Sequence, residues 1–251
     1  MKLTMKSNNH ITVILTNENF EKGFLRLRRS GVNLLHFPMI KTSSRKQNSN
    51  IDLKDKECII FTSKNGVKYF FTDSLAKEVK MDEKFFVCIG KKTAQKLKEF
   101  GFKASYVCKR NYSKFMSDEI KKSGVLKDKK SLLVQGSLSD NSLLDSLISF
   151  SNTQKAIFYN TELLNKKYDD LEKICQKEEP YVIFTSPSSF DSFINHYDPK
   201  KVNIVSIGNT TSSHINVKGF DTVLTSKMQS FEGISESLMA FLKEKSEYEL
   251  S

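Results

Sequence analysis

Serine, threonine and glycine recur at the ends of apolar segments, where their hydroxyl and backbone N–H groups could bind an anion. The tripeptide Phe-Thr-Ser closes an apolar run at residues 61–63 and again at residues 184–186, an offset of 123. A second pair follows, because "CIGKKTAQKLKEFGF" begins at residue 88 and "SIGNTTSSHINVKGF" at residue 206, an offset of 118. The agreement in order and spacing indicates two related halves in tandem.

Each of these turns precedes a segment with helical spacing, so its polar residues would lie at a helix N-terminus. The first turn of a helix has N–H groups without an intrahelical acceptor and a partial positive charge, which favour anion binding. The candidates are Ser63, Gly90, Thr93, Ser186, Gly208 and Thr211. Helix capping by serine or threonine explains any single turn more simply. For four such turns in two copies, a shared anion-binding cleft explains the pattern as well as helix capping does.

Other kinds of site have little support in the sequence. It contains no dinucleotide-binding G-x-G-x-x-G, no Walker A sequence, no paired carboxylates and no visible Ser-His-Asp order. The four cysteines lack C-x-x-C spacing, so we expect small buried apolar side chains and no metal site at Cys58, Cys88, Cys108 and Cys175. An enzyme site here would be rich in N–H and O–H donors and poor in titratable groups.

The charge balance favours an anionic partner only weakly. The 40 Lys and Arg against 29 Asp and Glu give a net charge of +11, but the lysines are scattered over predicted helix faces. Nucleic-acid binding would require clustered arginines with exposed aromatic residues and is not favoured. The apolar runs are too short to cross a bilayer, and the first residues show no signal-peptide pattern. We therefore expect a soluble cytoplasmic protein.

Short apolar runs alternate with segments of helical spacing along the whole chain. Strands are predicted at 11–16, 32–37, 58–62, 85–89, 104–107, 131–134, 156–159, 181–184, 203–206 and 222–224. Helices are predicted at 18–30, 65–79, 92–100, 113–122, 141–150, 168–175 and 231–245, and a polar loop at 41–50. The alternation predicts an α/β protein with parallel sheets. Because these strands are too many for one compact sheet, two doubly wound domains are expected.

The doubled F-T-S turn, the doubled I-G-x-x-T turn and "AIFYNTE" at residues 156–162 together resemble the uroporphyrinogen-III synthase family. The resemblance covers nearly the whole chain, from Val13 to the last predicted helix. It implies two flavodoxin-like domains, one from 1–38 with 163–251 and the other from 42–156. Two extended linkers near 38–41 and 158–162 would join them, with the substrate site in the cleft between the domains.

The resemblance also implies a cofactor-free and metal-free reaction. The family cyclises hydroxymethylbilane, a linear tetrapyrrole with acetate and propionate arms, and inverts its last pyrrole to give uroporphyrinogen III. Tyr159 matches the tyrosine of the family's Y-x-T segment and would assist the loss of hydroxide. The substrate-binding residues would be those of the twin turns, with Lys64, Asn65, Ser188 and Thr210 beside them. A monomer is expected.

The chain departs from the family's pattern where the family has arginine. Asn17 follows the first strand, which often leads into an arginine in the family, and Gln135 and Asn141 follow the strand at 131–134, after which the family commonly has arginines. Two expected cationic contacts are therefore missing. Lys64, Lys91 or Lys92 could replace them. A non-catalytic two-domain binding protein for a small polyanion is the alternative, because the same turns would serve it.

Overall fold

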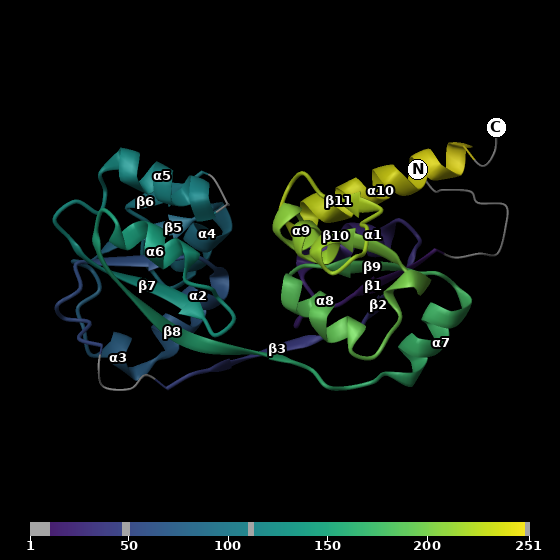
Figure 1. The fold of residues 1–251 in the computed structure, drawn as a ribbon, viewed down its shortest axis with the longest axis horizontal. Helices are drawn as coiled ribbons and strands as arrows, with labels where there is room; N and C mark the ends of the chain where they lie inside the picture. Colours follow the sequence, from purple (N-terminus) through teal and green to yellow (C-terminus); the bar gives the residue numbers. More distant parts are fainter. Residues whose placement is uncertain (1–10, 47–50, 110–112, 249–251) are drawn as a thin grey trace. The chain divides into compact units, whose positions relative to one another are not determined.

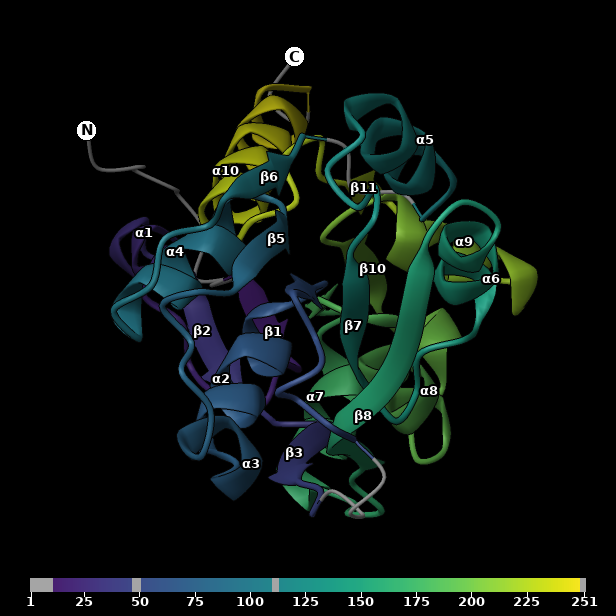
Figure 2. The ribbon, with the colours of Figure 1, turned by 90° about the vertical axis from the view of Figure 1, so that its left-hand side faces the viewer.

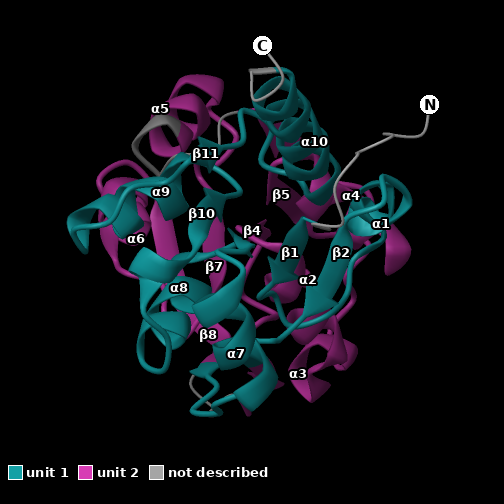
Figure 3. Cartoon of the chain, turned by 90° about the vertical axis from the view of Figure 1, so that its right-hand side faces the viewer, with its two compact units in different colours: residues 1–41, 162–251 teal, residues 42–161 magenta. Residues whose placement is uncertain are grey.

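The computed structural model describes residues 11–46, 51–109 and 113–248, and its chain divides into two compact units (Figures 1 and 3). Unit 1 draws on residues 1–41 and 162–251, and unit 2 on residues 42–161. Residues 1–10, where the sequence showed no signal-peptide pattern, lie outside the described residues. Residues 47–50 of the predicted loop lie outside them as well. Each unit is an open sheet with helices on both faces.

The sheet of unit 1 is entirely parallel. Its strands are β1 (Thr12–Leu15), β2 (Asn33–His36), β9 (Tyr181–Phe184), β10 (Asn203–Ser206) and β11 (Leu224–Thr225). They lie in the order β2-β1-β9-β10-β11, and every neighbouring pair is parallel. Counted in chain order this is 2-1-3-4-5, the flavodoxin-like order.

Helices cover both faces of this sheet, which is why its central strands β1 and β9 are buried at every position. The 3₁₀ helix η1 (Lys22–Phe24), α1 (Leu25–Arg29) and α10 (Phe231–Tyr248) pack on the face that contains Val13 and Leu15. The helices α7 (Asp169–Lys177), α8 (Pro187–Ile194) and α9 (Asn209–Val217) pack on the face that contains Ile14 and Val182. A second 3₁₀ helix, η2 (Pro199–Lys201), precedes β10. Continuous apolar runs are typical of parallel strands buried on both faces.

The sheet of unit 2 has six strands in the order β3-β8-β7-β4-β5-β6. They are β3 (Ile40–Ser44), β4 (Cys58–Phe61), β5 (Phe85–Ile89), β6 (Tyr106–Cys108), β7 (Lys130–Gly136) and β8 (Asn152–Leu163). All neighbouring pairs from β8 to β6 are parallel. The edge strand β3 is antiparallel to β8, because Arg45 donates to the carbonyl of Phe158 while Leu164 donates to that of Met39.

The helices of unit 2 also form two layers (Figure 2). The helices α2 (Lys64–Thr72), α3 (Ser74–Lys77) and α4 (Lys91–Glu99) pack on the face that contains Ile59 and Phe61. The helices α5 (Ser113–Ser123) and α6 (Ser142–Ile148) pack on the face that contains Ile60 and Val87. Unit 2 is therefore doubly wound like unit 1.

The two units have the same spatial arrangement of strands with a permuted chain order, and each takes strands from both halves of the tandem repeat. Without β3, the order β8-β7-β4-β5-β6 of unit 2 corresponds to β2-β1-β9-β10-β11 of unit 1. The first repeat supplies β1 and β2 to unit 1 and β4 to β6 to unit 2, and the second repeat does the reverse. The chain changes units between residues 41 and 42, in β3, and between 161 and 162, in β8. That residues 38–41 and 158–162 act as linkers stays a prediction.

Four local predictions were wrong. The helix predicted at 18–30 is confined to η1 and α1, and Phe20 is 42% exposed. The helix predicted at 65–79 is divided at Asp73, whose extended backbone ends α2 and whose carboxylate accepts from Leu75 to cap α3. The segment predicted as a loop at 41–50 contains most of β3, and β8 is three times as long as its predicted core of 156–159. The strand β3 forms through its pairing with β8, and β8 is lengthened by its pairing with β7 and β3, which a local pattern does not reveal.

Candidate functional site

Ser63 and Ser186 have nearly the same conformation and hydrogen bonds. Ser63 (φ −153°, ψ 161°) accepts from the N–H of Gly66 at 3.0 Å, and Ser186 (φ −158°, ψ 157°) accepts from that of Ser189 at 3.2 Å. The hydroxyl oxygen of Ser188 lies 3.0 Å from that of Ser186. Both twin serines are helix N-caps, as the simpler explanation of these turns predicts.

Glycine occupies the N-cap position at the two I-G-x-x-T turns. Gly90 precedes α4 with φ of 79°, a left-handed conformation that favours glycine, and Gly208 precedes α9 in an extended conformation. Glycine has no side chain with which to cap a helix, so the first N–H groups of α4 and α9 are more available to a ligand than those of α2 and α8. Thr93 and Thr211 are buried one turn in, whereas Thr210 is exposed.

In each unit the two kinds of turn lie at the same edge of the sheet. The strand β4 pairs with β5 and β9 pairs with β10, so the carboxyl ends of these parallel strands are adjacent. The helices that follow them also pack together, α2 with α4 and α8 with α9. The strand order reverses beside β4 and β9, and ligands of open α/β sheets bind at such points. The turns within each unit are thus brought together as the sequence predicts.

Tyr159 lies beside the first of these turns. Its hydroxyl oxygen is 3.2 Å from Oγ of Ser63, and its ring stacks on that of Tyr69 with the centroids 5.3 Å apart. The hydroxyl of Tyr69 donates to the backbone carbonyl of Thr42 at 2.9 Å. A Cβ added to Gly136 would lie 2.4 Å from the Tyr159 ring, so only glycine fits there. Tyr159 is held between Tyr69, Gly136 and Ser63.

The environment of Tyr159 keeps its hydroxyl protonated at neutral pH. Burial raises the pKa of Tyr159 above its ordinary value of 10, the hydrogen bond with Ser63 lowers it by less, and Tyr69 raises it further. A neutral phenol at a helix N-terminus can donate a proton to a departing oxygen. The arrangement can therefore combine general-acid assistance with anion binding.

The chain matches the family model of uroporphyrinogen-III synthase HemD over residues 25–236. This chain belongs to the uroporphyrinogen-III synthase HemD family. A curated relative, the porphyrin biosynthesis protein HemD of Ruminiclostridium josui, is 24% identical over 216 residues. The match covers 80% of this chain but 42% of that relative, so the chain spans less than half of the relative's length.

Two solved structures of uroporphyrinogen-III synthases are similar to this chain in fold. The enzyme from Helicobacter pylori is 19% identical with a TM-score of 0.69, and the match covers 92% of this chain and 99% of that one. A mutant enzyme from Thermus thermophilus is 15% identical with a TM-score of 0.62, with coverage of 93% and 99%. These comparisons confirm the α/β fold class and the predicted family.

Some residues of this HemD-family chain became notable only in the structure. Tyr69 and Gly136 position Tyr159, and no sequence signal marked Tyr69. Asn17 and Gln135 are buried at the ends of β1 and β7, whereas the sequence showed them only as departures from arginine. Asn17 and Gln135 are 118 residues apart, which equals the offset between the two I-G-x-x-T turns. This equal offset could have identified them from the sequence as equivalent positions of the repeat.

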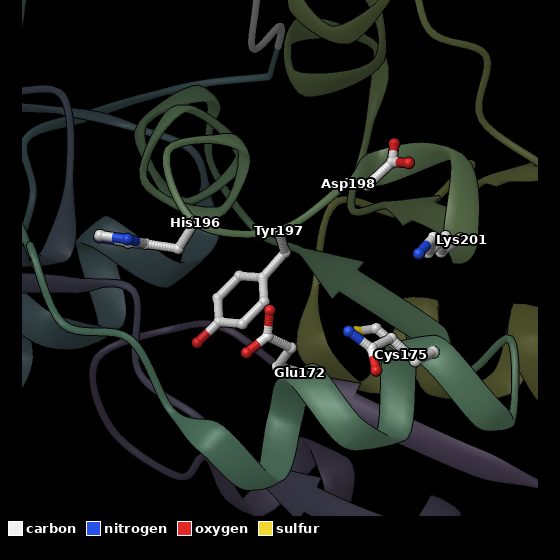
Figure 4. Close-up of a pocket in the computed structure, with 7 residues that line it drawn as sticks. Glu172, Cys175, His196, Tyr197, Asp198 and Lys201 are labelled. Carbon is white, nitrogen blue, oxygen red and sulfur yellow. The ribbon is translucent and has the colours of Figure 1, made fainter.

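The described residues of unit 1 also contain a small pocket, away from all the predicted site residues (Figure 4). Its volume is about 80 Å³, and it is lined by Glu172, Cys175, Gln176, His196, Tyr197, Asp198 and Lys201. Figure 4 shows His196 pointing away from Glu172 and Tyr197. A pocket for an organic ligand is several times larger. Among the described residues no cluster of three His, Cys, Asp or Glu could hold a metal ion.

The four cysteines are free and buried, as expected for small apolar side chains. Burial raises the pKa of Cys58, Cys88 and Cys108 to about 12 and that of Cys175 to about 11. Because the thiolate is the reactive form, these thiols are poor nucleophiles at neutral pH. In the part of the chain that the structure describes, no helix is both long enough and apolar enough to cross a membrane.

Proposed function

We propose that this protein is a uroporphyrinogen-III synthase, which converts hydroxymethylbilane to uroporphyrinogen III and water. The observation that carries the proposal is the Tyr159–Ser63 hydrogen bond at the N-terminus of α2, in a chain of the HemD family. This hydrogen bond supports a role for Tyr159 as a proton donor beside helix N–H groups that could bind an anion. Such a pair suits a substrate that must lose hydroxide and carries many carboxylates.

Tyr159 assists the first step. Its O–H donates a proton to the hydroxyl group of the substrate, the C–O bond breaks, water leaves, and a protonated azafulvene and the Tyr159 phenolate remain. The substituted carbon of the last pyrrole attacks the azafulvene carbon to give a protonated spiro pyrrolenine. The bond from this carbon to the methylene of the preceding pyrrole then breaks, which gives a second protonated azafulvene. The unsubstituted α-carbon of the reversed pyrrole attacks that methylene carbon, and the proton that it loses returns to the Tyr159 phenolate. The pyrroles supply the electrons, so the protein contributes proton transfer and positioning.

The twin turns bind the carboxylate arms. Backbone N–H groups and hydroxyls form charge-assisted hydrogen bonds with carboxylates, which are stronger than neutral ones and need no arginine. We assign substrate binding to Ser63, Lys64, Asn65, Gly90, Thr93, Ser186, Ser188, Gly208, Thr210 and Thr211. Lys64 is the first residue of α2, and Lys91 and Lys92 begin α4, so these lysines stand where cationic contacts would replace the missing arginines.

The decisive experiment couples the protein to a supply of hydroxymethylbilane and resolves the product isomers. We expect uroporphyrinogen III, formed faster than the spontaneous type I isomer. A product that is only type I would overturn the proposed activity. Tight binding of linear tetrapyrroles without turnover would instead identify a non-catalytic polyanion-binding protein.

We further propose that the protein acts as a cytoplasmic monomer without a cofactor, nucleic-acid partner or membrane partner. The dispersed lysines support the absence of a nucleic-acid surface. Light scattering should give the mass of one chain. The affinity for DNA should be negligible at all salt concentrations, whereas a steep salt dependence would indicate phosphate contacts.

A further inference from the structure

Asn17 and Gln135 occupy the same position in the two units. In unit 1, Leu15 pairs with Ile183, and in unit 2, Leu133 pairs with Ile60. Asn17 and Gln135 each stand two residues further along their strand. Ile183 and Ile60 each stand three residues before the twin serines. Asn17 follows β1 and Gln135 lies near the end of β7, so both amides stand at the carboxyl end of the first strand of a repeat, where the strand order reverses.

Both side chains are deeply buried and contain an unused hydrogen-bond acceptor. Asn17 is 5% and Gln135 8% exposed. The buried amide oxygens Oδ1 of Asn17 and Oε1 of Gln135 have no hydrogen-bond partner among the described residues. In Asn17 the amide nitrogen donates to the backbone carbonyl of Asn19. The third such atom of the described chain, Nε2 of His196, lies elsewhere in unit 1.

An unpaired buried acceptor is unfavourable, so its presence twice at one position requires a reason. Buried polar groups in folded proteins nearly always have a partner, and leaving one without a donor destabilises the fold. An apolar side chain of the same size would avoid this cost. The amides lie beside the ends of β4 and β9, which lead into α2 and α8, and the first N–H groups of those helices favour anions. Each unit thus places an acceptor beside donors for an anion.

We propose that Asn17 and Gln135 accept hydrogen bonds from N–H groups of a ligand that also carries carboxylates. This inference rests on the proposed function, in which each N–H belongs to a pyrrole of the linear tetrapyrrole. A pyrrole carries its N–H on one edge and its acidic arms on the opposite edge. The amide oxygen accepts from the N–H on the first edge, and the helix N-terminus binds the carboxylates on the second. An arginine in the same place offers only donors and cannot accept an N–H.

The test uses two unreactive ligands that differ only in this donor. One is a bilane with a methyl group in place of the hydroxymethyl group, and the other is its furan analogue, in which ring oxygens replace the N–H groups. Calorimetry should show that the unmodified protein binds the bilane more tightly than the furan analogue, by about tenfold for each acceptor. Asn17→Leu and Gln135→Met should each reduce this preference about tenfold, and the double variant should abolish it.

Two further measurements separate recognition from a structural role. Without ligand, Gln135→Met should melt at the same temperature as the unmodified protein or higher, because an unpaired acceptor is removed. Asn17→Leu removes an unpaired acceptor and also the hydrogen bond to Asn19, so its melting temperature should fall by no more than the loss of that one bond explains. The matched control is Gln176→Met, which removes an exposed amide on α7 and should leave the preference for the bilane unchanged.

Three outcomes would overturn the inference. Equal binding of the bilane and the furan analogue by the unmodified protein would overturn it alone and leave the proposed function standing. A variant that loses affinity for both ligands equally and melts at a lower temperature would show a structural role. Failure of the unmodified protein to bind either ligand would overturn the proposed function and the inference together.

Discussion

The hydroxyl oxygen of Tyr159 lies 3.2 Å from Oγ of Ser63, a residue 96 positions earlier in the chain. Ser63 at the same time accepts from the N–H of Gly66 and so caps α2. One serine therefore connects the phenol on β8 to the positive end of a helix. This connection gives Tyr159 a fixed position and a distinct chemical environment, and both can be tested.

Tyr159→Phe removes the proposed proton donor and keeps the ring. We expect kcat to fall by about 10²- to 10⁴-fold, the usual contribution of a general acid, because the hydroxyl of the substrate must then leave unassisted. The ring should still stack on Tyr69, so the melting temperature should change little. Turnover and thermal unfolding are measured on the same preparation. Unchanged turnover and melting temperature would exclude this role for Tyr159.

Gly136→Ala should displace Tyr159. The new Cβ would lie 2.4 Å from the Tyr159 ring, which is closer than real contacts allow. We expect a lower melting temperature and a fall in kcat, because Tyr159 would lose its position beside Ser63. Gly66→Ala is the stability control, since its Cβ would meet ordinary contacts at 3.4 Å or more and it lies in α2. That change should stabilise the protein by about 0.5–1 kcal/mol, as alanine does in a helix.

Ser63→Ala and Ser186→Ala remove equivalent helix caps. Each should lower the free energy of unfolding by about 1 kcal/mol. Only Ser63 contacts Tyr159, and their hydrogen bond lowers the pKa of that tyrosine. Spectrophotometric titration should therefore show a higher pKa for Tyr159 in Ser63→Ala and no change in Ser186→Ala. The same shift in both variants would contradict the pairing.

The raised pKa of Tyr159 predicts a loss of stability at high pH. Burial is the main cause, and it makes the folded protein hold this proton more tightly than the unfolded chain. The stabilisation is fully present below the unfolded pKa of 10 and is lost as the pH rises through the higher folded pKa. Denaturant unfolding at about pH 9 and about pH 11 should show a larger decrease for the unmodified protein than for Tyr159→Phe. Equal decreases would indicate that Tyr159 titrates normally.

The cysteines should resist alkylation in the folded protein. Their raised pKa values of about 11 to 12 leave almost no thiolate at neutral pH, and all four are buried. Iodoacetamide should modify them only after unfolding, which mass spectrometry can follow. Activity should be unaffected by the reagent under native conditions. Rapid modification of any of the four would show an exposed or activated thiol.

Much of the fold could be predicted because its signals are local. The strands β5, β9 and β10 have the bounds that their apolar runs predict, and the twin Ser-capped helices begin where the sequence indicates. The family resemblance also depends only on the order and spacing of short motifs. In contrast, β3 was missed because its polar residues form a strand only by pairing with β8. The helix break at Asp73 was missed because Asp73 caps α3 with its side chain, and hydrophobic periodicity does not detect a cap.

By itself the sequence determined the alternation of strands and helices, the tandem repeat and the positions of the twin serine and glycine turns. Buried strands and capped helices are encoded in neighbouring residues, so these features can be recognised locally. Only the tertiary structure decided that β3 pairs with β8, that Tyr159 contacts Ser63, and that Asn17 and Gln135 are buried at one equivalent position. These relationships join residues far apart in the chain, and packing selects among partners that a local pattern cannot distinguish.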